Sequence, residues 1–157
     1  MSTRRVLFLR NSDNYLLTAV EKDGLTYLTF VATYHNNNTS TSGNGAIASA
    51  IANASVDKNA QFDIIDAGQN RVRIQCIGNG KFWKLDRTHN WIRVEDVEIA
   101  TSDSLFLSVL DGLSYTAYQN VGNRMYCKTF TKQPVMDCVM ASGSDLTDAV
   151  KLIPMDI

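Results

Sequence analysis

Short apolar runs separated by polar turns are the dominant pattern along this chain. Apolar and polar residues alternate within many of these runs, as expected for strands with one buried face. No segment of 12 or more residues keeps the 3.6-residue apolar period of an amphipathic helix. Twelve runs at a spacing of roughly ten residues predict an all-β barrel or sandwich.

One phrase, a turn rich in Gly or Asn followed by an apolar run, occurs three times. The copies occupy residues 10–18, 77–85 and 120–128. Phe82 and Met125 lie 43 residues apart, whereas Tyr15 precedes Phe82 by 67 residues because a polar low-complexity stretch intervenes. A period in this range indicates one supersecondary unit used three times.

Each copy contains four apolar runs, and the other three kinds of run also recur. The opening runs are Val6–Leu9, Val72–Ile77 and Leu113–Tyr118; the middle runs are Leu25–Phe30, Trp91–Glu95 and Val135–Met140; the closing runs are Gln61–Ile65, Leu105–Leu110 and Val150–Pro154. The sequence therefore predicts one β-trefoil domain over residues 1–157, with three pseudo-repeats of four strands at about 6–66, 71–110 and 113–157. A closed barrel of this kind would leave few exposed sheet edges.

Turn chemistry supports the prediction of strands. Asp23-Gly24, Asn79-Gly80 and Asp111-Gly112 accept positive φ at low steric cost and favour tight hairpins. Of the two prolines, Pro134 is expected at a strand entry. Pro154 is expected on an edge or at a terminus, because proline cannot donate to a ladder of hydrogen bonds.

Composition limits the class of protein further. The 157 residues are 45% apolar and 20% charged with a net charge of −1, which is ordinary for a single globular domain. Lys and Arg are not clustered, so the sequence argues against a nucleic-acid partner. The odd count of three cysteines without a CxxC motif, and the short apolar run near Met1, predict a cytoplasmic or nuclear protein with no membrane insertion.

A polar insertion covers residues 35–59. Its first half has the composition of a flexible linker. In its second half Ile47, Ala50, Ile51 and Ala54 have helical spacing and predict one or two helical turns. The insertion is either a tolerated surface loop or a loop that covers a binding site or a subunit contact.

Catalytic and metal-binding motifs are missing from the sequence. His35 and His89 do not have metal-ligand spacing, and there is neither a Gly-x-Ser-x-Gly motif nor a phosphate loop. We therefore predict that the protein is not an enzyme and needs no metal or other cofactor.

Candidate binding residues gather between Thr88 and Glu95. If this stretch is a strand, Ile92 and Val94 share its buried face. The other face carries His89, Trp91, Arg93 and Glu95. An exposed indole beside polar side chains is a typical sugar-binding arrangement, since a pyranose stacks on the ring while its hydroxyls form hydrogen bonds. The alternative is an indole tucked under a loop or into the mouth of the barrel.

The second tryptophan, Trp83, is expected in the core, and it aligns with Leu16 and Tyr126 of the other copies. Tyr15, Phe82 and Met125 are expected to form an equivalent packed layer. Lys81, in the turn ahead of Phe82, could reach the same surface as His89.

These residues carry a resemblance to a known family. The stretch Val72–Leu85 followed by Asn90–Ile92 resembles the agglutinin domain of the amaranthin-like plant lectins, in which a Gly-Lys-(Tyr/Phe)-(Leu/Trp) hairpin precedes an Asn/Tyr-Trp-Ile strand. Further similar segments are Asn14–Leu17, Gly24–Phe30 and Ala60–Asp63. The resemblance covers roughly residues 6–110 and is diffuse in the last third of the chain.

This resemblance implies a β-trefoil that binds N-acetylgalactosamine and the galactose-containing T-antigen in a shallow site between neighbouring domains or subunits. It also implies a nucleocytoplasmic location and no enzyme activity. By position, the family's binding loop falls on Thr88, His89, Asn90 and Trp91. The founding lectin has two such domains in tandem, so a junctional site here would require a homodimer.

The sequence thus predicts a lectin for galactose- or N-acetylgalactosamine-type glycans, with one site per chain. The predicted carbohydrate-binding residues are Thr88, His89, Asn90, Trp91, Lys81 and Arg93. The alternative is a protein-interaction β-trefoil that does not bind sugar.

Overall fold

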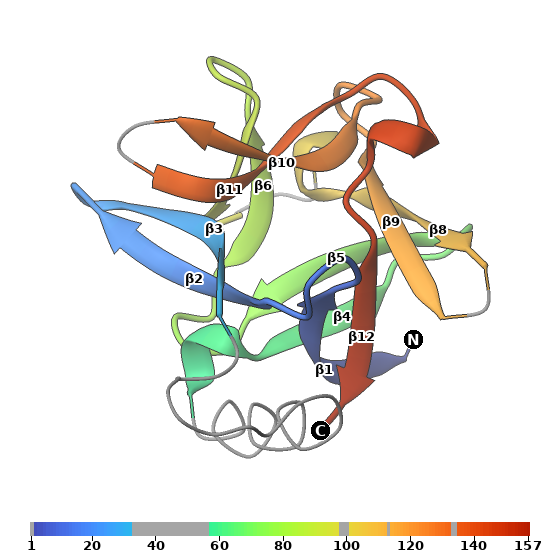
Figure 1. Ribbon diagram of the computed structural model, residues 1–157, viewed down its shortest axis with the longest axis horizontal. Helices are drawn as coiled ribbons and strands as arrows, with labels where there is room; N and C mark the ends of the chain where they lie inside the picture. Colours follow the sequence, from blue (N-terminus) through green and yellow to red (C-terminus); the bar gives the residue numbers. More distant parts are fainter. Residues whose placement is uncertain (1, 33–56, 98–100, 113, 133–134) are drawn as a thin grey trace.

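Twelve strands in three sets of four make up the described part of the chain (Figure 1). The computed structural model describes residues 2–32, 57–97, 101–112, 114–132 and 135–157. The first set contains β1 (Thr3–Arg10), β2 (Leu16–Lys22), β3 (Leu25–Val31) and β4 (Phe62–Asp66). The second contains β5 (Arg71–Cys76), β6 (Phe82–Asp86), β7 (Trp91–Glu95) and β8 (Phe106–Asp111). The third contains β9 (Tyr115–Asn120), β10 (Tyr126–Lys132), β11 (Val135–Gly143) and β12 (Leu152–Asp156).

Six of these strands close into a barrel. Around the ring β1 pairs with β4, β4 with β5, β5 with β8, β8 with β9, β9 with β12, and β12 again with β1. Every pair is antiparallel, and every strand of the ring has a neighbour on both sides. The barrel therefore has no continuous free edge, as the sequence predicts.

The other six strands form three hairpins, β2–β3, β6–β7 and β10–β11, and the second strand of each hairpin meets the other two. At each meeting point one residue pairs across two hairpins, and each strand uses two residues that lie two positions apart, one for each neighbouring hairpin. The pairs are Tyr27 with Arg93, Trp91 with Met140, and Cys138 with Thr29. A six-stranded barrel joined to three equivalent hairpins is the β-trefoil, so the predicted fold class is confirmed.

A backbone hydrogen bond at the start of each hairpin fixes how the three copies align. The bonds run from Arg10 N to Tyr15 O, from Cys76 N to Lys81 O, and from Asn120 N to Met125 O, at 2.8, 2.7 and 2.9 Å. The counterpart of Tyr15 is therefore Lys81, one residue earlier than the predicted Phe82. The prediction was wrong because it matched aromatic character, whereas the fold repeats the backbone turn.

The same shift applies to Trp83. The cross-strand pairs Leu17–Phe30, Trp83–Val94 and Cys127–Ala141 occupy equivalent places, so Trp83 corresponds to Leu17 and Cys127 rather than to Leu16 and Tyr126. Its core location is confirmed, because the ring is 1% exposed. Four aromatic rings surround it, those of Phe8, Phe62, Phe106 and Tyr118, with centroids 5.6 to 6.0 Å away.

Turns and prolines agree with the sequence wherever they are described. Asp23 and Gly24 have φ of 53° and 81° between β2 and β3, as a tight hairpin requires. Pro154 lies opposite Phe8 of β1, in a part of β12 that makes no register pair with β9, so its missing N–H leaves no gap in a ladder. Pro134 and the helical turns predicted within 47–54 lie outside the described residues. The end of the insertion is described from Asp57, whose side chain caps the 3₁₀ turn η1 (Lys58–Ala60).

Candidate functional site

The six predicted residues all lie on or beside the β6–β7 hairpin. Thr88 and His89 are exposed in its turn, and Asn90 is half-buried with φ of 62°. The carbonyl oxygen of Asn90 accepts a hydrogen bond of 2.8 Å from the backbone of Ala141. The turn is thereby anchored to β11 of the next repeat while its side chains reach solvent.

The expectation of an exposed Trp91 ring is wrong. The residue is 5% exposed, and its indole meets Tyr27 edge-on at 5.3 Å, in a cluster with Cys138 and Met140. Alternation does place Trp91 opposite to Ile92, which belongs to the barrel core. However, β7 is flanked by strands of both other repeats, and their side chains cover the ring. The structure supports the alternative, an indole that is packed away.

Asp86, which is not among the six predicted residues, is the centre of the polar group at this hairpin. Its Oδ1 accepts the backbone N–H of Thr88 at 3.1 Å. Its Oδ2 lies 3.8 Å from His89 Nδ1 and 3.4 Å from Arg93 Nε, and the side chain is 17% exposed. The spacing Asp-x-Thr at the end of a strand, which is typical of an Asx turn, was the available signal.

Arg93 and Lys81 have different places relative to this group. Arg93 is 15% exposed, and its Nη2 also lies 3.5 Å from Glu95 Oε2. Lys81 precedes β6 at the other end of the hairpin, where its Nζ lies 3.8 Å from Asp96 Oδ2. Five residues of strand, or about 16 Å, separate Lys81 from Asp86. The structure therefore unites Thr88, His89 and Arg93 around Asp86 and leaves Lys81 apart.

A groove of about 230 Å³, lined mainly by residues with polar or charged side chains, lies elsewhere, where the third repeat meets the first. It is bounded by the β1–β2 turn, by β10, and by the segment between η3 (Leu146–Asp148) and β12, and these strands are labelled in Figure 1. Its lining residues are Arg10, Asn11, Ser12, Lys128, Thr129, Asp148, Ala149, Val150 and Lys151.

The two equivalent junctions are filled by side chains. The turns that correspond to the β1–β2 turn have glycine, Gly78 or Gly122, where the first repeat has Ser12. A Cβ on Gly78 would lie 2.3 Å from Asn59 Oδ1, and one on Gly122 would lie 2.2 Å from Asp103 Oδ1. The side chains of η1 and of η2 (Ser102–Ser104) thus occupy the space beside these turns.

Chain length explains why the third junction differs. One residue separates η1 from β4 and η2 from β8, whereas Ala149, Val150 and Lys151 separate η3 from β12. The two extra residues form part of the groove wall. The groove is therefore a place where the threefold symmetry of the fold is broken.

Charges around the groove are largely balanced. Arg10 binds Asp13 and Asp137 through paired contacts of 2.7–2.9 Å, which raise its pKa, chiefly through the hydrogen bond to Asp137. Lys151 Nζ donates to Leu146 O at 2.8 Å and lies 3.3 Å from Asp111 Oδ2. These two cations are already neutralised by protein groups.

Lys128 and Asp148 remain at the groove. Hydrogen bonds from Ser144 to the Asp148 carboxylate lower its pKa, with a further contribution from the positive charge of Lys128, so Asp148 is ionised at neutral pH. In the described part of the chain the Lys128 ammonium forms no hydrogen bond or direct ion pair. The two groups offer one cation and one anion to a ligand.

Replacing Gly122 by alanine is expected to lower the free energy of unfolding by about 1–3 kcal/mol, because the new Cβ would displace Asp103 from Arg87. Urea unfolding followed by fluorescence would measure this. The matched control is Ser12→Ala at the equivalent turn position, which should stay within about 0.5 kcal/mol of wild type. Equal stability of the two variants would show that Asp103 does not fill the junction between the second and third repeats.

Neither a metal centre nor a spanning helix appears in the described segments. Within them no three His, Cys, Asp or Glu side chains are grouped so that they could hold a metal ion. No helix among the same residues is long and apolar enough to cross a membrane.

Comparisons with known proteins show the fold. No protein-family model and no curated protein matches this chain. ThreeFoil, a designed threefold-symmetric protein, is similar with a TM-score of 0.69 at 9% identity, covering 98% of this chain and 99% of ThreeFoil. The BEL β-trefoil has a TM-score of 0.64 at 11% identity and covers 98% of this chain and 93% of its own.

The third similar structure belongs to a larger protein. It is an endo-β-galactosidase from Clostridium perfringens that releases GlcNAcα1-4Gal, with a TM-score of 0.62 at 15% identity over 98% of this chain. This chain spans only 33% of the length of that enzyme. At such identities the likeness concerns architecture alone: the chain has a β-trefoil fold with threefold pseudosymmetry.

Proposed function

We propose that this β-trefoil is a carbohydrate-binding protein, a lectin for galactose- or N-acetylgalactosamine-type glycans, and not an enzyme. The observation that carries the proposal is the Asp86 carboxylate at the tip of the β6–β7 hairpin, held between Arg93 and His89. A carboxylate accepts hydrogen bonds from sugar hydroxyls, and the neighbouring Arg and His can donate to ring or hydroxyl oxygens.

The backbone fixes this group before a ligand arrives. The bond from Thr88 N–H to Asp86 orients the carboxylate, and the bond between Asn90 and Ala141 holds the turn. His89, with 52% of its side chain exposed, is the outermost member. Trp91 acts as a buried support under the turn instead of as a stacking platform. Preorganisation of this kind lowers the entropic cost of binding.

Affinity at one such site is expected to be weak, because a hairpin tip buries little ligand area. Dimerisation would add avidity if two chains present their tips to one multivalent glycan. The resemblance to the amaranthin-like lectins and the architecture shared with part of an enzyme that acts on galactose-containing glycans support this choice of sugar. We place the protein in the cytoplasm or nucleus, as the sequence predicts.

Titration with galactose, N-acetylgalactosamine and the T-antigen disaccharide, followed by NMR chemical shifts, tests the proposal. We expect Asp86→Asn to weaken binding at least tenfold, about 1.4 kcal/mol, because the carboxylate charge is lost while an oxygen remains for the Thr88 bond. Asp96→Asn, at the far end of the same hairpin, is the matched control and should bind like wild type.

Two results of this titration would refute the proposal. Shifts that are missing at Thr88, His89 and Arg93 at saturating sugar would refute the hairpin-tip site. Binding that stays unchanged in Asp86→Asn would refute the role of the carboxylate.

A protein-interaction β-trefoil is the second candidate, and exposed apolar side chains favour it. Leu110, Met136 and Phe130 are 72%, 59% and 46% exposed. A protein ligand that resists displacement by free sugar, and that is lost on Leu110→Ser or Phe130→Ser, would support this function over the first.

A further inference from the structure

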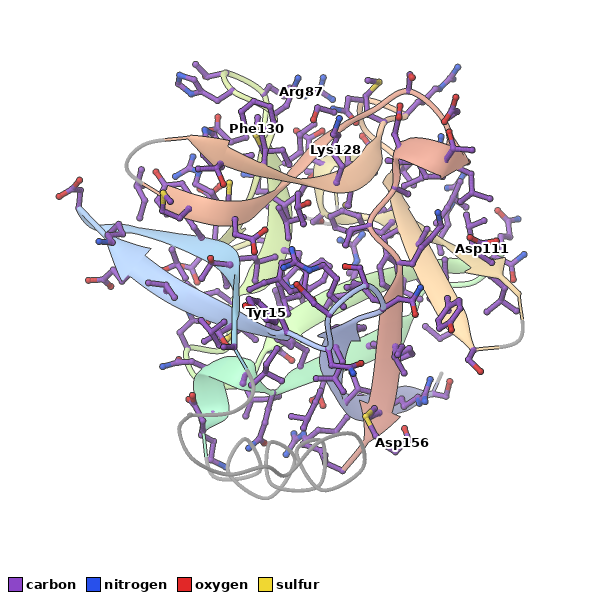
Figure 2. The ribbon with its side chains drawn as sticks, viewed as in Figure 1. Tyr15, Arg87, Asp111, Lys128, Phe130 and Asp156 are labelled. Atoms are coloured by element: carbon purple, nitrogen blue, oxygen red, sulfur yellow. The ribbon has the colours of Figure 1, made fainter. Side chains whose placement is uncertain are left out.

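We propose that the groove between the third and first repeats is a second binding site, which takes a single pyranose-sized polyol ring. It is independent of the hairpin-tip site, since the groove contains no residue of the β6–β7 hairpin. Figure 2 labels Lys128 on β10, which forms one wall.

Asp148 and Lys128 have unused hydrogen-bonding capacity at the groove. Ser144 N and Ser144 Oγ both bond to Oδ2 of Asp148, at 3.1 and 2.9 Å, and no described residue donates to its Oδ1. Lys128 lies close enough to help to lower the pKa of Asp148, yet the two form no direct ion pair. A donor and an acceptor that line the same groove without a direct ion pair can both bond to a ring that carries hydroxyls.

The third side of the groove supplies neutral polar groups. Asn11 and Ser12 are exposed in the β1–β2 turn, and Thr129 lies beside Lys128. The turn is fixed on the groove because Asn11 N–H donates to Lys151 O at 2.9 Å. Amide and hydroxyl side chains can both donate and accept hydrogen bonds, and the hydroxyl groups of a polyol do the same.

Size limits the ligand to one ring. Pockets for drug-sized ligands hold about 300–1,000 Å³, and this groove holds about 230 Å³. The groove can therefore accommodate one sugar unit, free or at the end of a glycan chain, whereas a disaccharide would extend into solvent.

Charge favours a neutral ligand over an anion. Arg10 forms ion pairs with Asp13 and Asp137, and Lys151 forms one with Asp111. The positive charges of Arg10 and Lys151 are therefore balanced by protein carboxylates and attract an anion only weakly. An anion drawn to Lys128 would also face the ionised Asp148. A neutral polyol meets one cation and one anion without such repulsion.

NMR titration of the whole chain with galactose, glucose and mannose tests this site. We expect shifts at Asn11, Ser12, Thr129 and Ala149 with a millimolar dissociation constant. Lys128→Met, which keeps the aliphatic stem, and Ser12→Leu, which fills the groove, should each weaken these shifts at least fivefold. Lys22→Met, at the exposed end of β2, is the matched control and should leave them unchanged.

Several results would overturn the proposal. One is the lack of shifts at the groove at saturating monosaccharide, and another is full binding in both groove variants. Larger shifts with inorganic phosphate than with sugar would assign the groove to anions instead. Because Asp86→Asn removes only the hairpin-tip site, failure of either site can be told from failure of the other.

Discussion

Replacing Trp83 by alanine is expected to lower the free energy of unfolding by about 3–5 kcal/mol, a large part of the roughly 5–15 kcal/mol that stabilises a typical domain. Trp83 is fully enclosed by the rings of Phe8, Phe62, Phe106 and Tyr118, which come from four different barrel strands. Removing the indole would leave a cavity that these rings cannot fill without leaving their own strands. Chemical unfolding followed by circular dichroism would measure the loss.

Two further variants make this test specific to the core. Trp83→Phe retains a ring, and its smaller cavity should cost less than the alanine variant. Phe130→Ala removes a ring that is 46% exposed and should change stability by about 0.5 kcal/mol or less. A loss for Trp83→Ala as small as that for Phe130→Ala would show that the barrel is not packed around the indole.

The second large effect is expected at Arg10. Its guanidinium binds Asp13 of the β1–β2 turn and Asp137 of β11, and it lies 4.4 Å from the centre of the Phe30 ring. Arg10→Met would leave two carboxylates unpaired, which costs about 3–5 kcal/mol at fully buried sites. Asp13 and Asp137 are about one-third exposed, so we expect about 2 kcal/mol here.

The pH dependence of this loss has a defined sign. Burial acts to raise the pKa of Asp13, but hydrogen bonds from Arg10 and from Tyr15 N–H outweigh it and hold the pKa below its ordinary value of 3.8. A carboxyl with a lowered folded-state pKa stabilises the fold above its unfolded-state pKa, and this contribution is lost as the pH falls through the folded-state pKa.

The difference between wild type and Arg10→Met should therefore be largest near pH 7 and shrink below about pH 4. Urea unfolding at pH 7, 5 and 3 would measure it. Arg10→Lys is the informative companion, since a lysine cannot bridge two carboxylates in bidentate fashion and should recover only part of the stability. A difference that grows on acidification would contradict the role of the ion pairs.

The architecture could be predicted from the sequence because its signals are local. Alternation and turn dipeptides such as Asp23-Gly24 need only a few neighbouring residues, and the same short pattern appears three times. The alignment of the copies was less accurate. Side-chain character placed Phe82 opposite Tyr15, whereas a backbone hydrogen bond places Lys81 there.

The burial of Trp91 could not be predicted in this way. Whether its ring reaches solvent depends on Tyr27 and Met140, which lie on strands from the two other repeats. Alternation within one strand separates two faces but does not say what covers the second. Asp86 was missed because its partners follow it in the turn and on the returning strand, so only the folded hairpin collects them.

The groove was equally hidden. Two extra residues before β12 look like ordinary loop variation until the three 3₁₀ turns are compared through their strands. The first repeat has Ser12 at the turn position where the other two have Gly78 and Gly122. This difference can be interpreted only in the folded structure, where Asn59 and Asp103 lie against those glycines.

The pairing of β1 with β12 also bears on how the protein is made. A ribosome makes β1 before the other described strands and β12 after them, and the ring cannot close before both exist. Until β12 has been made, one edge of β1 and one edge of β9 lack the strand with which they pair in the barrel. Nascent chains thus carry open strand edges until β12 has been made, and such edges favour aggregation.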